Sequence, residues 1–388
     1  MKKTLIVAAV AASFATAASA QSSVTLYGLV DAGFTYVNNV QAGKGADHLK
    51  DSQWNMRGGN VNMSRWGLRG AEDLGGGMKA IFTLESGFDV ANGGSLGGSG
   101  FGRQAYVGLS THAGTVTLGH QTDSVTDYLG PISATGSWGG TFFAHPGNLD
   151  NLNGDLFREN NSVKFQSANY AGLTFSGLYA FSNAAGSFAA NRAYSVGAGY
   201  ANAGLKLGAA YMQANLHDNG GNYGSAITGV TVDVPNMQDS QLFNSGIDRQ
   251  RTFGAGGSYS IGAVTFGALW TQIRQDSYES NVASNIINNY EVNGRYALTP
   301  ALSLGAAYTF TNAKFSTVAG ESTHVRFHQF GLQTDYALSK RTDIYAEGVV
   351  QVASGLPEGV MPYAGISGVP NSSSSRQVLV TTGIRHRF

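Results

Sequence analysis

The sequence predicts an all-β protein, a 16-stranded antiparallel transmembrane β-barrel with short turns at one end and long loops at the other. Segments of about ten residues alternate apolar and polar side chains, as strands with two different faces do. Short and long connections between these segments alternate along the chain. Charged residues make up only 12% of the 388 residues, about half the share in an ordinary soluble protein, while glycine is frequent with 54 residues.

The composition excludes several other classes of protein. The formal net charge is zero, so the basic excess of a nucleic-acid-binding protein is missing and we expect no nucleic-acid partner. Cysteine is absent, which excludes a disulfide scaffold and a thiolate metal site. The hydrophobic content of 42% excludes a disordered chain. A helical membrane protein would show runs of about 20 apolar residues, and the sequence has none.

The N-terminus has the three parts of an export signal. Two lysines at residues 2–3 are followed by the apolar stretch 5–18 and by a small-residue cleavage motif at 18–20. We therefore expect residues 1–20 to be a cleaved Sec signal peptide. Residues 21–388 are then expected to form a single barrel domain outside the cytoplasm.

The alternation is clear at both ends of the mature chain. One face of the first segment is formed by Val24, Leu26, Gly28, Val30, Ala32, Phe34 and Tyr36. One face of the last segment is formed by Val378, Val380, Thr382, Ile384, His386 and Phe388. A barrel of sixteen strands is too wide for side chains to fill its lumen, so we expect the polar face to line water. The apolar face, which includes glycines, then meets lipid.

The connections between the segments come in two lengths. Short turns are expected at residues 72–77, 112–114, 171–172, 202–204, 262–263, 298–301 and 339–341. Longer polar loops are expected at residues 39–60, 89–101, 121–158, 183–191, 216–248, 276–288, 314–325 and 354–375. Strict alternation of these connections yields the sixteen strands and places all loops on one side. Outer-membrane barrels have this pattern, with periplasmic turns and extracellular loops.

Several stretches resemble the general diffusion porins of Gram-negative bacteria, particularly those of the β-proteobacterial type. They are SVTLYGLVDAGF (23–34), SRWGLRGAEDLGGGMKAIFTLESGF (64–88), RQAYVGLS (103–110), GTVTLGHQ (114–121), DYALSKRTDIYAE (335–347) and TTGIRHRF (381–388). The resemblance implies a homotrimer in contact with outer-membrane lipid. It also implies one water-filled pore per barrel for passive diffusion of small hydrophilic solutes and ions, with the third loop, 121–158, folded into the lumen.

The resemblance further implies a charged constriction. Porins of this kind place arginines on one wall opposite acids of the third loop, and such charges set ion selectivity. The matching arginines are Arg65, Arg69, Arg103 and Arg158. The acids of the third loop include Asp123, Asp127, Asp150 and Asp155. We expect Asp123 and Asp127 to line the pore, because they open the loop near the wall.

Two departures from the family pattern bear on selectivity. The family commonly has Gly-Arg-Gln at the end of the fifth strand, where this chain has Gly119-His120-Gln121. We therefore expect His120 to place a neutral or titrating side chain in the pore. The acidic Pro-Glu-Phe-Gly-Gly motif of the third loop is also missing, and residues 137–141 read Ser-Trp-Gly-Gly-Thr.

The chain ends in an aromatic residue, Phe388. By resemblance, this C-terminal strand is the signal that the barrel assembly machinery of the outer membrane reads. That machinery is therefore an expected partner.

No motif predicts an enzyme, a cofactor or a metal site. Residues 93–97 match G-x-S-x-G, but they lie in a glycine-rich loop and not in the strand–turn–helix of a nucleophile elbow. His324 and His328 would lie about 13 Å apart on a strand, too far to share a metal ion. We expect a non-enzymatic protein without cofactor or metal.

Three alternatives to a general diffusion channel stay open. A substrate-selective channel would have the same fold. A surface-binding barrel, either an adhesin or a receptor, would work through its long loops, such as 216–248 and 354–375. An outer-membrane enzyme would need catalytic side chains clustered near one rim, and the sequence shows no such cluster.

Overall fold

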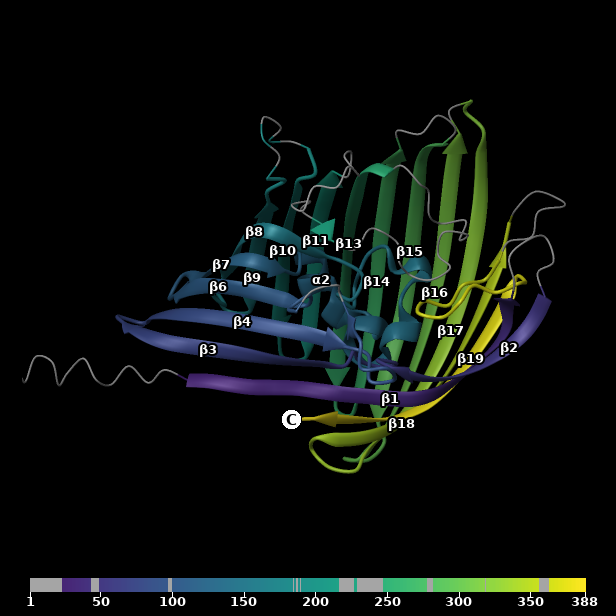
Figure 1. Cartoon of the computed structure of the whole chain (residues 1–388), viewed down its shortest axis with the longest axis horizontal. Coiled ribbons are helices and arrows are strands. Elements are labelled where there is room, and N and C mark those ends of the chain that lie inside the picture. Colours follow the sequence, from purple (N-terminus) through teal and green to yellow (C-terminus); the bar gives the residue numbers. More distant parts are fainter. Residues whose placement is uncertain are drawn as a thin grey trace, which may run out of the picture.

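The described part of the chain forms one closed barrel of sixteen antiparallel strands, as predicted. Closure occurs where β1 (Ser23–Ala42) pairs with the last strand, β19 (Arg376–Arg387), and Figure 1 shows the C-terminus beside β1. The computed structural model describes residues 23–42, 49–96, 100–183, 185, 188, 190–215, 227–228, 247–277, 282–317, 319–355 and 363–388. The expected signal peptide, residues 1–20, lies outside these ranges.

The second strand of the barrel consists of two pieces. β2 (Leu49–Gly58) and β3 (Arg65–Gly75) pair with different halves of β1, and residues 59–64 leave the wall between them. The other barrel strands are β4 (Met78–Phe88), β6 (Gln104–Thr111), β7 (Gly114–Gln121), β8 (Arg158–Ser167), β9 (Leu173–Ala180), β10 (Ala193–Asn202), β11 (Leu205–Asn215), β13 (Ile247–Ile261), β14 (Val264–Ser277), β15 (Val282–Ala297), β16 (Leu302–Thr317), β17 (Ser322–Ala337) and β18 (Thr342–Ser354). Two short strands add to the sheet, β5 (Ser95–Leu96) and β12 (Ile227–Thr228).

The predicted turns are found between neighbouring strands, but three predicted loops are wrong in extent. The expected loop 39–60 contains β2, which pairs with the loop end of β1. Most of the expected loops 276–288 and 314–325 is strand, because β15 begins at Val282 and β16 continues to Thr317. These strand ends carry polar residues on both faces, so polarity no longer marks where the strand stops.

The strand faces are arranged as predicted, with apolar side chains outward. Leu26 and Phe34 on β1 are exposed on the outer surface, whereas Asp31 and Thr35 on the same strand are fully buried inside. In an ordinary soluble protein the apolar side chains point inward and the polar ones outward. A barrel surrounded by lipid requires the reverse arrangement.

The third loop lies inside the barrel, between opposite walls (Figure 1). It contains α2 (Ser124–Leu129) and four short helical segments, η2 (Gly130–Ile132), η3 (Thr135–Gly139), η4 (Thr141–Phe143) and η5 (Pro146–Asn148). Three clusters of buried apolar residues join the loop to the inner faces of the strands. None of the helices in the described ranges is long and apolar enough to cross a membrane.

Inward-facing glycines make room for this loop. A Cβ atom on Gly305 would lie 2.4 Å from the ring of Trp138, and one on Gly331 would lie 2.4 Å from the ring of Phe143. The two rings pack edge to face, with 5.0 Å between their centroids. The expectation that glycine belongs to the lipid face is therefore wrong at these positions, where the missing side chain admits the loop.

Candidate functional site

Three of the predicted arginines meet on one wall of the lumen. Arg65 opens β3, Arg103 directly precedes β6, and Arg158 opens β8. Arg103 is central: its Nε lies 2.8 Å from Oε1 of Glu85, and its Nη1 lies 2.7 Å from Oδ1 of Asp155. Nε of Arg65 lies 3.7 Å from Oε2 of Glu85. Because β3, β4, β6 and β8 supply these side chains, the barrel wall itself sets their spacing.

The arginine wall exposes its charged groups unequally to the lumen. Three guanidinium groups lie near the carboxylates of Glu85, Asp155 and the fully buried Glu159, and Arg158 also interacts electrostatically with Arg103. Arg103 and Arg158 are almost fully buried, whereas the side chain of Arg65 is 26% exposed and that of Asp155 is 16% exposed. Arg65 and Asp155 are therefore the members of the group that border the open lumen.

A cavity of about 650 Å³ lies between the third loop and the loop ends of the neighbouring strands, and Asp155 is part of its lining. Four amide side chains also line it; they are Gln53, Asn55, Asn148 and Asn153. Arg57 borders the cavity as well, with its guanidinium carbon 5.5 Å from the ring centre of Phe142. A cavity with this lining can hold water and small polar solutes.

The two preferred acids of the third loop have other contacts. Asp123 is 1% exposed and accepts hydrogen bonds from two backbone N–H groups of α2, so it caps that helix. Burial, reinforced by the nearby Asp127, raises the pKa of Asp123 to about 6. Asp127 forms an ion pair with Lys164 and accepts a hydrogen bond from Thr122. Asp155 is the loop acid that contacts the arginine wall.

Arg69 lies on the inner face, as its spacing from Arg65 predicts, but nearer the turns. Its guanidinium carbon is 4.8 Å from the ring centre of Tyr27. Tyr27 in turn donates a hydrogen bond of 3.0 Å to Glu85. Arg69 is thus joined to the arginine wall through an aromatic ring and lies on the turn side of it.

His120 lies on the outer face, which corrects the expectation that it lines the pore. The pairing of β7 with β8 is irregular between Gly119 and Gln121. Gln121 is buried, and His120 is the cross-strand partner of Ala105, whose face of the strand is directed outward. The ring nitrogens of His120 contact Asn160 and a backbone carbonyl at 2.7 and 3.0 Å.

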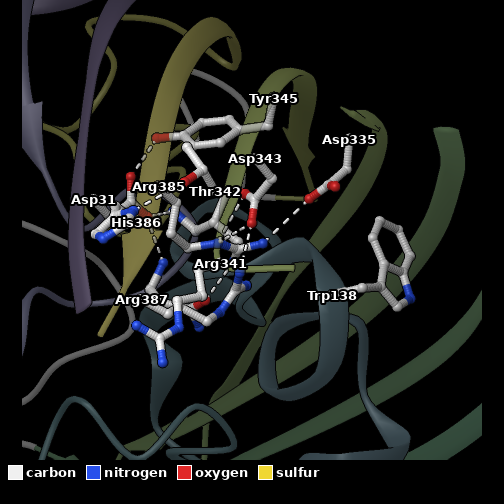
Figure 2. Close-up of polar contacts among 12 residues, drawn as sticks. Asp31, Trp138, Asp335, Arg341, Thr342, Asp343, Tyr345, Arg385, His386 and Arg387 are labelled. Atoms are coloured by element: carbon white, nitrogen blue, oxygen red, sulfur yellow. Dashed lines mark hydrogen bonds and ion pairs between the residues drawn. The ribbon is translucent and has the colours of Figure 1, made fainter. Parts of the chain in front are cut away.

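A second polar group, which no sequence motif indicates, holds residues 59–64 inside the lumen. Oδ2 of Asp31 accepts backbone hydrogen bonds from Val61 and Asn62 at 2.9 and 2.7 Å. The hydroxyl of Tyr345 donates to Oδ1 of Asp31 at 2.5 Å, as Figure 2 shows. Asp31 therefore fixes the break between β2 and β3.

Arg385 extends this group toward the turns (Figure 2). Its Nε lies 3.0 Å from Oδ1 of Asp343, and its Nη2 lies 3.2 Å from Oδ2 of Asp335. Arg387 contacts the other oxygen of Asp343 at 2.6 Å. The period-two pattern of the last strand could have identified Arg385, because it falls between the outward residues Ile384 and His386.

The third loop is attached to the far wall through His145. This side chain is fully buried; its Nδ1 lies 2.6 Å from Oδ2 of Asp150, and its Nε2 lies 3.0 Å from Oε2 of Glu291. Burial alone would lower the pKa of His145, but the two carboxylates outweigh it and raise the pKa to about 10. Thr271 donates a further hydrogen bond to Asp150 at 2.6 Å. A buried imidazolium thus connects the loop to β14 and β15.

Comparison with known proteins identifies the family. Residues 7–351 match the family model described as Gram-negative porin. An outer membrane porin of Bordetella pertussis is 32% identical over the full length of both chains, and outer membrane porin protein 32 of Delftia acidovorans is 29% identical over the full length of both. The solved structure of an anion-selective porin from Comamonas acidovorans shares the fold, with a TM-score of 0.69 and 24% identity over 95% of this chain and 100% of that one. The chain belongs to the Gram-negative porin family and is an outer-membrane protein.

Proposed function

We propose that this porin forms a water-filled channel for passive diffusion of small hydrophilic solutes and ions across the outer membrane. The observation that carries the proposal is the contact between the third loop and the arginine wall, made by Asp155 and Arg103 at 2.7 Å. This contact narrows the lumen at a place where both borders are charged. Solutes that pass must exchange contacts with polar groups and water, which favours hydrophilic molecules.

We propose that the constriction favours anions over cations. The most exposed charged group of the wall is Arg65, while Glu85 and Glu159 are buried. The acids expected at the loop start, Asp123 and Asp127, are engaged by the helix α2 and by Lys164. Charges that line a narrow pore determine which ions enter it. The related solved porin from Comamonas acidovorans is named as anion-selective, which is consistent with this proposal.

We further propose a non-enzymatic homotrimer whose last strand is read during assembly. One solved structure of similar fold is the trimer form of OmpT from Vibrio cholerae. At the end of the chain, Phe388 exchanges two backbone hydrogen bonds with Gly28, and its side chain is 44% exposed on the outer surface. An exposed aromatic terminus on a closing strand is available to the assembly machinery and to lipid.

Single-channel recording in a planar bilayer, under a salt gradient, tests the channel and its selectivity. Stable conductance in steps of three and a reversal potential of anion-selective sign are expected. Changing Arg65→Ser and Arg103→Ser should lower the anion-to-cation permeability ratio at least twofold. The variant Arg65→Ser alone should give a smaller shift in the same direction, and it leaves the buried Arg103 pairs intact.

Arg274→Ser is the matched control, because Arg274 is also exposed but lies on the outer face of β14. Its reversal potential should equal that of the unchanged protein. Folded protein that leaves the bilayer silent would overturn the channel proposal. A cation-selective potential, or one that the Arg65 and Arg103 changes do not move, would overturn the proposed role of the arginine wall.

A further inference from the structure

Three arginines crowd around one carboxylate on the outer face of the barrel, at the loop ends of β13 and β14. Nη2 of Arg249 and Nη2 of Arg251 each lie 2.7 Å from Oδ2 of Asp276, and Nε of Arg274 lies 3.4 Å from Oδ1. The alternate residues on these strands face the lumen and are buried; they are Gln250, Thr252, Ile273 and Gln275. The guanidinium groups therefore lie outside the pore.

Among the described residues, the acids near this cluster do not balance its positive charge. Asp248 also interacts with Arg249, so Arg249 has two acids beside it, whereas the ion pairs of Arg251 and Arg274 in the described part of the chain are both with Asp276. Arg251 and Arg274 are direct cross-strand partners, and like charges in that position destabilise a sheet. Nε of Arg251 is buried and has no hydrogen-bond partner among the described residues. An anion bound here would relieve the repulsion and supply acceptors.

Aromatic side chains place the cluster at the surface of the membrane. Phe253 is the next outward residue of β13 toward the turns, and its ring packs edge-on against Trp270 with 5.4 Å between centroids. Trp270 is the cross-strand partner of Tyr290. Rings of this kind form the girdle at the lipid–water boundary of outer-membrane barrels. The cluster lies on the loop side of this girdle, at the level of the headgroups of the outer leaflet.

Further basic residues flank the cluster along the barrel. Ile286 on β15 is the cross-strand partner of both Arg274 on β14 and Lys314 on β16. Lys314 therefore lies level with Arg274, two strands away. On the other side, the carbonyl of Arg192 accepts a backbone hydrogen bond from Asn215, the cross-strand partner of Arg249. The positive charge therefore continues over several strands, as a ligand with more than one anionic group requires.

We propose that Arg249, Arg251 and Arg274 bind the phosphate groups of a phosphorylated glycolipid of the outer leaflet, of the lipid A type. Arginine binds phosphate through paired, charge-assisted hydrogen bonds, and the acyl chains of the lipid would lie against the aromatic and apolar surface below. The site is separate from the pore, so its occupancy does not depend on whether the channel conducts.

Lipid binding to the purified, full-length folded protein in detergent tests this proposal. The probe is bis-phosphorylated lipid A, compared with the same lipid after removal of its phosphates and with inorganic phosphate. The double variant Arg251→Gln, Arg274→Gln removes the surplus charge and leaves Arg249 paired with Asp276. We expect it to lower the affinity for bis-phosphorylated lipid A at least tenfold, to the level of the dephosphorylated lipid.

The control variant Lys340→Gln, Arg341→Gln removes two exposed basic residues from the turn between β17 and β18, at the opposite end of the barrel. It should bind lipid A as the unchanged protein does. The proposal is overturned if the Arg251 and Arg274 changes leave the affinity unaltered, if the dephosphorylated lipid binds equally well, or if inorganic phosphate binds tightly and lipid A does not compete. If the double variant does not fold, Arg274→Gln alone should still lower the affinity at least threefold.

Discussion

Nε2 of His145 lies 3.0 Å from Oε2 of Glu291, although 146 residues separate the two side chains along the chain. Both side chains are fully buried, and Asp150 contacts the other ring nitrogen of His145. Two carboxylates share one imidazolium between the third loop and β15. This contact holds the third loop against the wall formed by β14 and β15.

Replacing His145 should loosen the third loop. In His145→Asn, the carboxylates of Asp150 and Glu291 face each other without a cation, and losing one partner of a buried ion pair costs about 3–5 kcal/mol. We expect larger conductance fluctuations in single-channel recordings, with the barrel still folded. His120→Asn is the control, because His120 lies on the outer face. Quiet traces of unchanged size from His145→Asn would contradict this role.

The stability of the docked loop should fall as pH rises. The pKa of Asp123 is raised from 3.8 to about 6 in the folded protein, so the folded state holds this proton more tightly. Docking then loses up to ~3 kcal/mol between about pH 4 and 6. The pKa of His145 is raised from 6.5 to about 10, so the stability it contributes is complete below about pH 6.5 and is lost as pH rises through 10.

Channel recordings at a series of pH values test both of these pH ranges. Conductance fluctuations should increase from pH 4 to 6 and again above pH 7. Asp123→Asn should abolish the lower step, and it keeps a good helix cap at this position. His145→Asn should abolish the upper step. Fluctuations that decrease with rising pH would have the wrong sign for both groups.

The glycine beneath Phe143 should tolerate no side chain. In Gly331→Ala, the new Cβ would lie 2.4 Å from the Phe143 ring, and overpacking of this kind costs about 1–3 kcal/mol. The third loop should shift and the conductance should change. Gly348→Ala is the matched control, because no atom of the described residues lies within 4 Å of the added Cβ. Equal conductance in the two variants would show that this close approach does not position the loop.

The acid that faces the arginine wall should dominate selectivity. Asp155→Asn removes the loop carboxylate beside Arg103 and should raise the anion-to-cation permeability ratio at least twofold. Asp127→Asn breaks the ion pair with Lys164 and should have a smaller effect. The reversal potential in a salt gradient measures both. A larger shift from Asp127→Asn would support the expectation from the sequence and reject the assignment of Asp155.

Several side chains of the candidate site could be placed from the sequence, and the reason is local. Arg65 and Arg69 are four positions apart on a strand, so they share a face wherever that strand lies. His120 was misplaced because its expected position came from the family motif and not from the alternation, which places it on the outward face with Leu118. The alternation also places Asp31 and Arg385 on the inward face of their strands. Nothing in their own segments indicated that they would contact residues from distant strands.

The sequence by itself determined the all-β barrel, its number of strands and its polar interior. Alternation and connection length are properties of short segments, and a membrane permits few ways to satisfy them. Only the tertiary structure decided the path of the third loop and the acid that meets the arginines. That path depends on Gly305 beneath Trp138, Gly331 beneath Phe143 and Glu291 beside His145. These contacts join residues far apart in the chain, so no local sequence pattern predicts them.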